Sequence, residues 1–322
     1  MTSVKSVGAS ERQSGSEGWA LPPSDDSTPR PPTLLIVDGH AFAYRAFHAI
    51  RHLSSPTGVP TNAIYGFIKM LDKMVAGVAP SHLLVVWDGG LSNERTTAFP
   101  SYKSQRAPMP ADLGPQIDAL QVYLRAASIS FYCEDGVEAD DWIAAMTRQA
   151  LASGLPVVIA SADKDFMQLV CSGVGLLNPN DKSGKIWAAE DVRAKTGVAP
   201  DQIVDWLSLI GDSVDNIPGV PGVGTKTATD LLQRFGSVDR LYARLTEVKS
   251  VRLRTSLEAA AEVVQLNKQL IRLKDDLADV WPLEKTRLTP PETPRLRTLY
   301  AEWGFRTMLE QISAGPEQRG LL

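Results

Sequence analysis

Thr33-Leu34-Leu35-Ile36-Val37-Asp38-Gly39 is a short apolar run that ends in an acid and a glycine. Its aliphatic residues follow one another without helical spacing, which is typical of a buried strand. Similar runs occur at residues 82–87, 129–133, 156–160 and 174–177, and stretches with helical spacing lie between them at 63–75, 113–126 and 140–153. Strands that alternate with helices predict an α/β fold with a mostly parallel central sheet flanked by helices.

The chain changes character after residue 201, where strand-like runs stop. Helices are predicted at residues 201–210, 226–234, 238–243 and 250–273. We expect an α/β domain over residues 33–210, an all-helical region over 211–290, and a C-terminal segment, 291–322, that packs back on the α/β domain. Residues 89–115 form a long connection without a clear strand, and such connections are usually functional or mobile.

Composition excludes some classes of protein. No apolar run is long enough to cross a bilayer. Residues 1–32 are rich in Ser, Gly and Pro and predict a disordered tail. Cys133 and Cys171 lie in apolar segments, which indicates reduced, buried thiols in a cytoplasmic protein. The four histidines and two cysteines do not have the spacing of zinc ligands.

Charge is distributed unevenly along the chain. The net charge is −4, but residues 216–256 hold seven basic and three acidic residues, so this stretch carries +4 and the remainder −8. A basic part and an acidic part are consistent with one region that grips phosphate and another that concentrates carboxylates.

Acidic residues follow most of the predicted strands. They are Asp38, Asp88, the group Glu138, Asp140 and Asp141, and the pair Asp163 and Asp165; the helical region then adds Asp212 and Asp215. In an open α/β sheet, the carboxyl ends of the strands form one working edge, so these side chains should converge.

Helix capping is the alternative explanation for each of these acids. One acid per helix satisfies a cap, however, and this sequence places three together and then two. So many like charges are costly unless cations neutralise them. Oxygen ligands without His or Cys select Mg²⁺ or Mn²⁺. Two such ions, roughly 3.5–4 Å apart, are the usual device for phosphodiester cleavage.

A glycine-rich turn opens the most basic stretch. Gly219, Gly222 and Gly224 precede a helix that begins near Thr225 and Lys226. Glycines let a backbone approach phosphate closely, and the first amides of a helix bind it. We interpret this segment as the hairpin of a helix-hairpin-helix element, which holds a DNA backbone without reading bases. Gly is also common at helix ends, so a Gly-rich turn alone is weak evidence for DNA binding. The position of this turn directly after Asp212 and Asp215 strengthens the interpretation.

Taken together, these motifs resemble the 5′ nuclease family, which includes flap endonucleases and the 5′–3′ exonuclease domain of bacterial DNA polymerase I. The resemblance spans residues 34–312. It rests on Val37-Asp38-Gly39-His40, Ala43-Tyr44-Arg45-Ala46-Phe47-His48, Tyr65-Gly66-Phe67, Tyr102-Lys103, Arg106-Ala107-Pro108, Glu138-Ala139-Asp140-Asp141, Ala162-Asp163-Lys164-Asp165, Gly211-Asp212, Asp215-Asn216 and the glycine hairpin.

The resemblance implies a PIN-like nuclease fold with two metal sites. Asp38, Asp88, Glu138, Asp140 and Asp141 would hold one ion, and Asp163, Asp165, Asp212 and Asp215 the second. Residues 89–115 would form a helical arch for a 5′ single strand. Lys103, Arg106 and Arg45 would face the scissile phosphate, Tyr102 would contact DNA, and carbonyls near Val220 and Val223 would bind K⁺. Without the family pattern, Lys103 and Arg106 would be ordinary loop charges and Arg45 a surface ion pair.

The implied activity is that of a structure-specific 5′–3′ exonuclease and 5′-flap endonuclease in replication and repair. Its substrate would be DNA with a free 5′ end, at a flap, nick, RNA-primed or branched duplex, and its partner a separate polymerase. We expect a cytoplasmic, nucleoid-associated monomer that does not bind membranes.

The sequence departs from the family in two places. Trp87-Asp88-Gly89-Gly90 replaces the usual Phe-Asp-Ala, and the chain ends at Leu322 without a polymerase region, which favours a stand-alone member.

Two rival functions fit less well. A DNA-binding protein with a decayed site would have lost carboxylates, and a small α/β ribonuclease would lack the arch segment and the hairpin. The balance between exonuclease and flap endonuclease stays open.

Overall fold

A six-stranded sheet forms the centre of the α/β part, in the order β3-β2-β1-β4-β5-β6. This computed structural model describes residues 31–278 and 280–313, so the predicted tail lies almost entirely outside the described residues. Strands β1 to β5 pair in parallel and β6 is antiparallel, which confirms the predicted mostly parallel sheet. The strands are β1 (Leu34–Asp38), β2 (His82–Val86), β3 (Ser130–Tyr132), β4 (Val157–Ala160), β5 (Val174–Leu177) and β6 (Ile186–Trp187).

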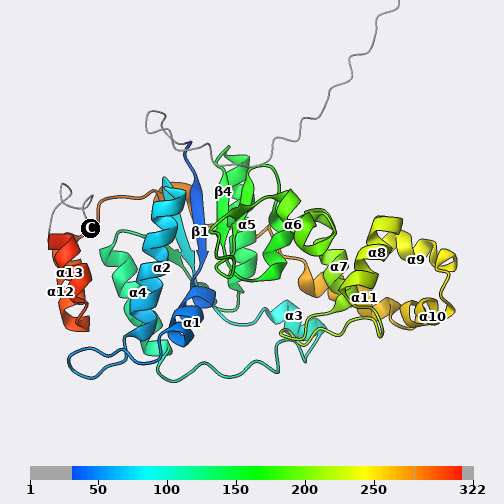
Figure 1. Cartoon of the computed structure of the whole chain (residues 1–322), viewed down its shortest axis with the longest axis horizontal. Helices are drawn as coiled ribbons and strands as arrows, with labels where there is room; N and C mark the ends of the chain where they lie inside the picture. The colour runs from blue at the N-terminus through cyan, green and yellow to red at the C-terminus, as the bar shows by residue number, and fades with distance from the viewer. Residues whose placement is uncertain (1–30, 279, 314–322) are drawn as a thin grey trace, which may run out of the picture.

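Helices cover both faces of the sheet (Figure 1). One face, including Leu35 and Val85, packs against α1 (Gly39–Ala49), α2 (Asn62–Val78) and α4 (Gly114–Ala126). The same apolar cluster includes residues of α12 (Thr293–Trp303) and α13 (Arg306–Ser313). The opposite face, including Ile36 and Ile159, packs against α5 (Ala139–Ala152). Burial on both faces explains why the strands are continuous apolar runs rather than alternating ones.

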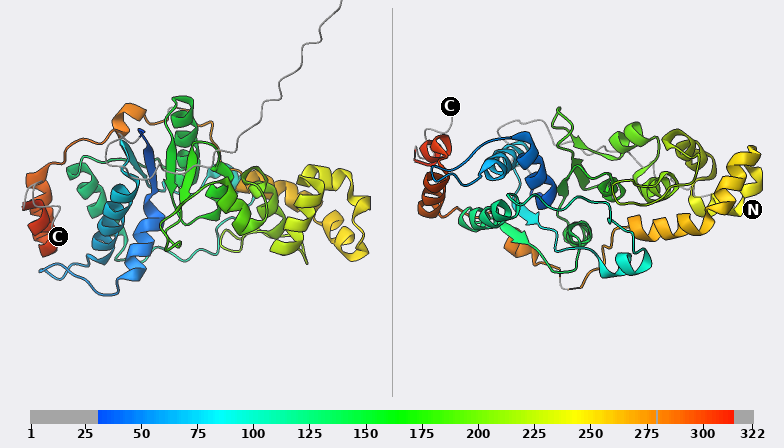
Figure 2. Two further views of the ribbon diagram at one scale, coloured as in Figure 1. Left: turned by 45° about the horizontal axis from the view of Figure 1, so that its top comes forward. Right: turned by 90° about the horizontal axis from the view of Figure 1, so that it is seen from below.

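The helical part lies at the opposite end of the molecule from α12 and α13 (Figure 2). It contains α7 (Ile203–Ile210), α8 (Thr225–Phe235), α9 (Val238–Ala243), α10 (Val251–Ala259) and α11 (Ala261–Ile271). The single helix predicted over residues 250–273 is wrong, because the chain breaks at Ala260, which ends α10 and precedes α11. Both helices bury apolar residues in the same core, so their spacing continues across a break that neither Gly nor Pro marks.

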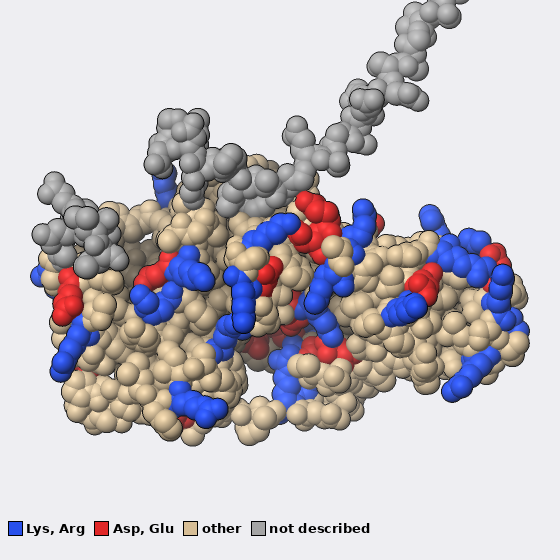
Figure 3. Space-filling model, in the orientation of Figure 1, with Lys and Arg blue, Asp and Glu red and all other residues tan. Residues whose placement is uncertain are grey.

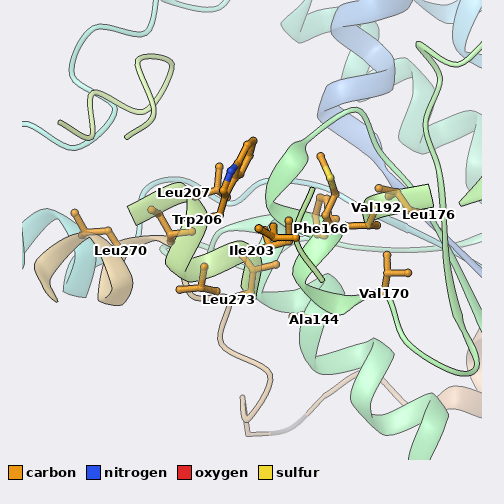
Figure 4. Close-up of a cluster of buried hydrophobic side chains, with 14 of the residues drawn as sticks. Ala144, Phe166, Val170, Leu176, Val192, Ile203, Trp206, Leu207, Leu270 and Leu273 are labelled. Carbon is orange, nitrogen blue, oxygen red and sulfur yellow. The ribbon is translucent and has the colours of Figure 1, made fainter. Parts of the chain in front are cut away.

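One hydrophobic core joins the sheet to the helical part. It runs from the strands through α5 and the 3-10 helix η1 (Lys164–Leu169) to α7 and α11. Figure 4 shows Phe166 of η1 beside Ile203 of α7, with Leu270 and Leu273 at the end of α11. The α/β part and the helical part are therefore not separated by a polar boundary.

Two further α-helices belong to the α/β part. Helix α3 (Asn93–Ala98) lies within the arch segment, residues 89–115, and α6 (Ala189–Thr196) follows β6. Cys133 and Cys171 are exposed, so the prediction of buried thiols is wrong; each lies at the end of an apolar run where the chain reaches the surface. Among the described residues, none of the helices combines the length and apolar character needed to cross a membrane.

Candidate active site

Asp38, Asp88 and Asp163 follow the carboxyl ends of β1, β2 and β4, as expected. Asp38 ends β1 and caps α1 by accepting the amide of Ala41 at 3.0 Å. Glu138 precedes α5, and Asp163 caps η1 by accepting the amide of Asp165. Asp38 and Asp163 therefore both cap a helix and lie at the shared edge, whereas Glu138 makes no capping hydrogen bond. The two explanations offered by the sequence coexist.

A cavity of about 990 Å³ opens at this edge. The space-filling view shows acidic side chains gathered in a hollow near the middle of the molecule (Figure 3). Six predicted ligands line it: Asp38, Asp88, Asp140, Asp163, Asp212 and Asp215. Lys103 and Arg106 also line it, so the arch segment contributes its basic residues to the same cavity.

Glu138 is the centre of a buried hydrogen-bond network beside the cavity. It accepts from the Lys103 ammonium at 2.6 Å, the Tyr102 hydroxyl at 3.1 Å and the Ser92 amide at 3.1 Å. The Arg95 guanidinium lies 3.2 Å away. Burial alone raises the pKa of Glu138, but the charges of Lys103 and Arg95 outweigh it and the pKa is lowered. Glu138 is thus held as a carboxylate.

The loop between α7 and α8 holds the arch segment over the cavity. The Asp215 carboxylate pairs with Arg106 at 2.5 Å, and its backbone carbonyl accepts the Lys103 amide. Asn216 donates to the Ser101 carbonyl at 2.8 Å. Lys103 has a φ of 54°, a left-handed conformation that is uncommon for a residue other than Gly and is concentrated at functional sites.

Several carboxylates repel one another. Burial raises the pKa of Asp38 to about 6, and the charges of Asp163 and Asp88 add to this. Burial and then the Asp163 charge raise the pKa of Asp140 and of Asp165 well above the usual range. Burial also raises the pKa of Asp163, with contributions from Asp215 and Asp212. A cation in the cavity would relieve this repulsion.

The donor set fits hard divalent cations, although the side chains do not enclose an ion as they stand. Within residues 31–278 and 280–313, no three Asp, Glu, His or Cys side chains are arranged to hold a metal ion. Lys103 and Arg106 occupy oxygens of Glu138 and Asp215, and Lys164 pairs with Asp212 at 3.3 Å. The buried Oδ1 of Asp165, however, has no hydrogen-bond partner. Oxygen-only donors and an unpartnered carboxylate oxygen suit Mg²⁺ or Mn²⁺ once the side chains of Lys103, Arg106 and Lys164 move away from the carboxylates.

The predicted metal ligands Glu138, Asp141 and Asp165 do not line the cavity, and neither do Arg45 and Tyr102. Arg45 donates to Asn180 and to the Pro179 carbonyl, and lines a neighbouring apolar cavity of about 690 Å³. Tyr102 is 4% exposed, with its hydroxyl on Glu138. Asp141 is buried and points to Arg95.

The hairpin leads into the exposed start of helix α8, whose first amides are free of a side-chain cap. Gly222 has a φ of 82°, and Gly224 precedes α8, whose first amides receive no side-chain cap. Thr225 and Lys226 at this end are exposed. Gly219 packs directly on the backbone that ends α7, where an added Cβ would lie 2.3 Å from the Ile210 carbonyl oxygen.

The valines proposed beside a K⁺ site are buried. The Val220 carbonyl accepts the Val223 amide at 3.0 Å.

Sequence reasoning missed several residues that organise the site. His40 accepts the Asp88 amide at 2.9 Å, and Ser161 donates to Asp38 at 2.8 Å. Arg95 binds two of the predicted ligands, and Asn267 of α11 donates to the Pro218 carbonyl in the hairpin at 2.6 Å. His40 and Ser161 adjoin strand-end acids, which was an available signal. Arg95 and Asn267 are joined to the site only by the tertiary fold.

The fold free of divalent ions should lose stability as pH rises from about 4 to about 6. A carboxyl group whose pKa is raised by folding binds more protons in the folded state than in the unfolded state. For Asp38, the stability that this gives is therefore lost as pH rises from 3.8 to about 6. This shift corresponds to about 3 kcal/mol. Burial lowers the pKa of His40, which acts in the opposite direction below its usual value. Urea unfolding in chelator at several pH values measures the slope.

Asp38→Asn is the control for this pH effect. It should flatten the slope, and saturating Mg²⁺ should flatten it in the unmutated chain. An unchanged slope in Asp38→Asn would show that Asp38 does not titrate as described.

Comparison with known proteins identifies the family. Residues 33–197 match the model of the 5′-3′ exonuclease N-terminal resolvase-like domain, and residues 198–294 that of the 5′-3′ exonuclease C-terminal SAM fold. The 5′-3′ exonuclease of Aquifex aeolicus is 36% identical over 281 residues, which cover 87% of this chain and 95% of that protein. DNA polymerase I of Rhizobium leguminosarum is 37% identical over 288 residues, 87% of this chain but 28% of the polymerase. The chain thus spans about a third or less of the polymerase relatives.

Solved structures have the same fold. The 5′-exonuclease of bacteriophage T5 with bound zinc aligns with a TM-score of 0.63 at 23% identity, covering 75% of this chain and 90% of that one. The catalytic core of Rad2 in complex with DNA substrate aligns with a TM-score of 0.61 at 16% identity, covering 88% and 92%. The fold, the acids at the strand ends and the two matched regions all indicate the same family, and the chain belongs to the 5′-3′ exonuclease family.

Proposed function

We propose that this chain hydrolyses DNA phosphodiester bonds near a free 5′ end, as a 5′–3′ exonuclease and flap endonuclease that depends on divalent metal ions. The observation that carries the proposal is the cavity lined by six aspartates, which come from the ends of β1, β2 and β4, the first turn of α5 and the loop after α7. Mutual repulsion makes such a cluster of carboxylates unfavourable unless cations are bound. The basic residues Lys103 and Arg106 at the same cavity suit a phosphate. The metal-bound and DNA-bound structural relatives support the same reading.

Two groups of residues would hold the ions. Asp38, Asp88, Glu138 and Asp140 would hold one ion, and Asp163, Asp165, Asp212 and Asp215 the second. When bound, a pair of Mg²⁺ or Mn²⁺ ions supplies an activated water and neutralises charge on the attacking and leaving oxygens. Asp141 and its Arg95 partner stand behind the first group.

The chain's own residues would position the DNA. Arg106 is 41% exposed at the cavity and is placed to bind a non-bridging phosphate oxygen when it leaves Asp215. The amides at the start of α8 and the Lys226 ammonium would hold a duplex phosphate, because the first turn of a helix attracts anions. K⁺ binding by carbonyls near Val220 and Val223 would strengthen the same grip. Substrates with RNA at the 5′ end belong to the proposal as well.

The decisive assay compares 5′-labelled flap, nicked and blunt duplexes in Mg²⁺, Mn²⁺ and chelator. We expect cleavage near the 5′ end of the flap and nick, and none in chelator. Binding without cleavage in either metal would support the alternative of a DNA-binding protein with an inactive site. Cleavage that persists in chelator would exclude the metal mechanism.

Arg106→Ala and Lys103→Ala should lower turnover more than they lower affinity for duplex DNA. Both side chains are expected to act on one phosphate in the transition state, so turnover should fall about 10²-fold. Single-turnover rates at saturating DNA and a separate binding titration measure the two effects. Lys195→Ala removes an exposed lysine from α6 and is the matched control. Equal losses in affinity with unchanged turnover would show that Lys103 and Arg106 are only solvated charges.

A further inference from the structure

Arg95 is the most extensively bound basic side chain beside the cavity. It lies in α3, in the arch segment, and is 4% exposed. Its Nη1 and Nη2 donate to both oxygens of Asp141 at 2.9 and 2.7 Å, and Nη1 lies 3.2 Å from Glu138. A bidentate guanidinium–carboxylate pair fixes orientation as well as distance.

The same guanidinium also binds the end of α11. Its Nε donates to the Leu270 carbonyl at 3.0 Å, and Nη2 donates to the Arg272 carbonyl at 3.2 Å. The last carbonyls of a helix lack partners within the helix and attract cations. Arg95 therefore joins the arch segment, the carboxylates before and within α5, and the C-terminal end of α11.

Helix α11 continues this connection to the hairpin. Its Asn267 donates to the carbonyls of Ser208 in α7 and Pro218 in the hairpin, at 3.0 and 2.6 Å. The end of the helix is also tied to η1, because Gln168 donates to the Ile271 carbonyl and accepts the Leu273 amide. A shift of the hairpin would thus be transmitted through α11 to Arg95 and to η1, which Asp163 caps.

Both carboxylate oxygens of Asp141 are engaged by other groups in this arrangement. Both oxygens are bound to Arg95, and Oδ1 also accepts the Lys274 amide at 2.9 Å. The neighbouring Asp140 instead lines the cavity, whereas Asp141 does not. The adjacent carboxylates of α5 thus have different surroundings.

We propose that Arg95 is a positioning residue that sets the carboxylates of Glu138 and Asp140 relative to α11 and the hairpin, and that Asp141 is its anchor rather than a metal ligand. The inference rests on the proposed function. It predicts that losing either member of the pair misplaces the carboxylates without removing a ligand. Arg95 acts through these groups and touches neither metal nor DNA.

The first test is a metal titration that needs no turnover. Calorimetric titration of Mn²⁺ into the full chain without DNA compares Asp140→Asn with Asp141→Asn. Asp140→Asn should weaken Mn²⁺ binding at least about tenfold, whereas Asp141→Asn should change it less than about threefold. Equal weakening by the two variants would make Asp141 a ligand and overturn the proposal.

The second test is a double-mutant cycle on turnover. Arg95→Met and Asp141→Asn should each lower kcat about 10- to 100-fold, with DNA affinity changed less than about threefold. The double variant should be no slower than the slower single variant, because both remove one interaction. Arg95→Lys keeps the positive charge but loses the planar guanidinium that binds both oxygens of Asp141. It should retain more turnover than Arg95→Met. Arg148→Met removes an exposed arginine from α5 and is the matched control.

Several outcomes of the cycle would contradict the inference. Multiplied losses in the double variant would show independent roles, and unchanged kcat in folded Arg95→Met would leave only a structural role. If Arg95→Met does not fold, the double variant still decides, since it removes the charges of both partners. A failure of the proposed function would instead appear as absent cleavage by the unmutated chain, with the Mn²⁺ titration unaffected.

Discussion

Asp163→Asn is expected to lower turnover about a thousandfold while affinity for duplex DNA stays equal or increases. Asp163 lies in the cavity, and its charge is repelled by those of Asp215 and Asp212. If Asp163 holds a cation as proposed, its loss would weaken that site, and a preorganised electrostatic group of this kind is worth up to about 10³ in rate. The same change lessens repulsion of the DNA phosphates.

The measurement pairs single-turnover cleavage of a flap substrate with a DNA-binding titration in Ca²⁺. Asp118→Asn, at an exposed position of α4, removes the same charge away from the cavity and should leave both values unchanged. A turnover within about threefold of the unmutated chain would exclude Asp163 from the chemistry.

Gly219→Ala should destabilise the chain by about 3 kcal/mol and abolish tight binding of duplex DNA. Its Cβ would lie 2.3 Å from the Ile210 carbonyl oxygen and 2.9 Å from the Gly211 amide nitrogen. Both neighbours are backbone atoms, so the loop after α7 must open. That loop carries Asp212 and Asp215, and cleavage should fall together with binding.

Two other glycines of the hairpin separate the possible causes. Gly222 has open space around its Cα but a φ of 82°, so Gly222→Ala should cost about 1–2 kcal/mol of backbone strain. Gly224 has open space and a negative φ, so Gly224→Ala should cost less than about 1 kcal/mol. Urea unfolding and DNA titration of the three variants give the order. A Gly219→Ala variant as stable as Gly224→Ala would show that the close approach does not constrain the hairpin.

Most of the fold was predictable because buried parallel strands are apolar along their whole length. Strand β6 was missed because two residues cannot show a pattern, and the break at Ala260 was missed because helical spacing continues across it. The strand-end acids were predictable for the same topological reason as the sheet, since parallel strands bring their carboxyl ends to one edge.

The connections behind the acids were not predictable. Arg95 lies in a polar stretch that reads as a solvated loop, and its burial exists only because residues 46 and 175 positions later in the chain meet there. Tyr102 likewise gives no sequence signal that its hydroxyl binds Glu138. Such contacts depend on distant segments that local patterns cannot bring together.

The continuous core described above has a consequence for how the molecule fails. Phe166 of η1 and Ile203 of α7 belong to one apolar cluster that also includes the end of α11, so the acidic edge and the helical part share the core on one face of the sheet. Unfolding of one part should therefore unfold the other, and we expect a single calorimetric transition. On the proposed function, a molecule that unfolds on heating would lose cleavage and duplex binding together.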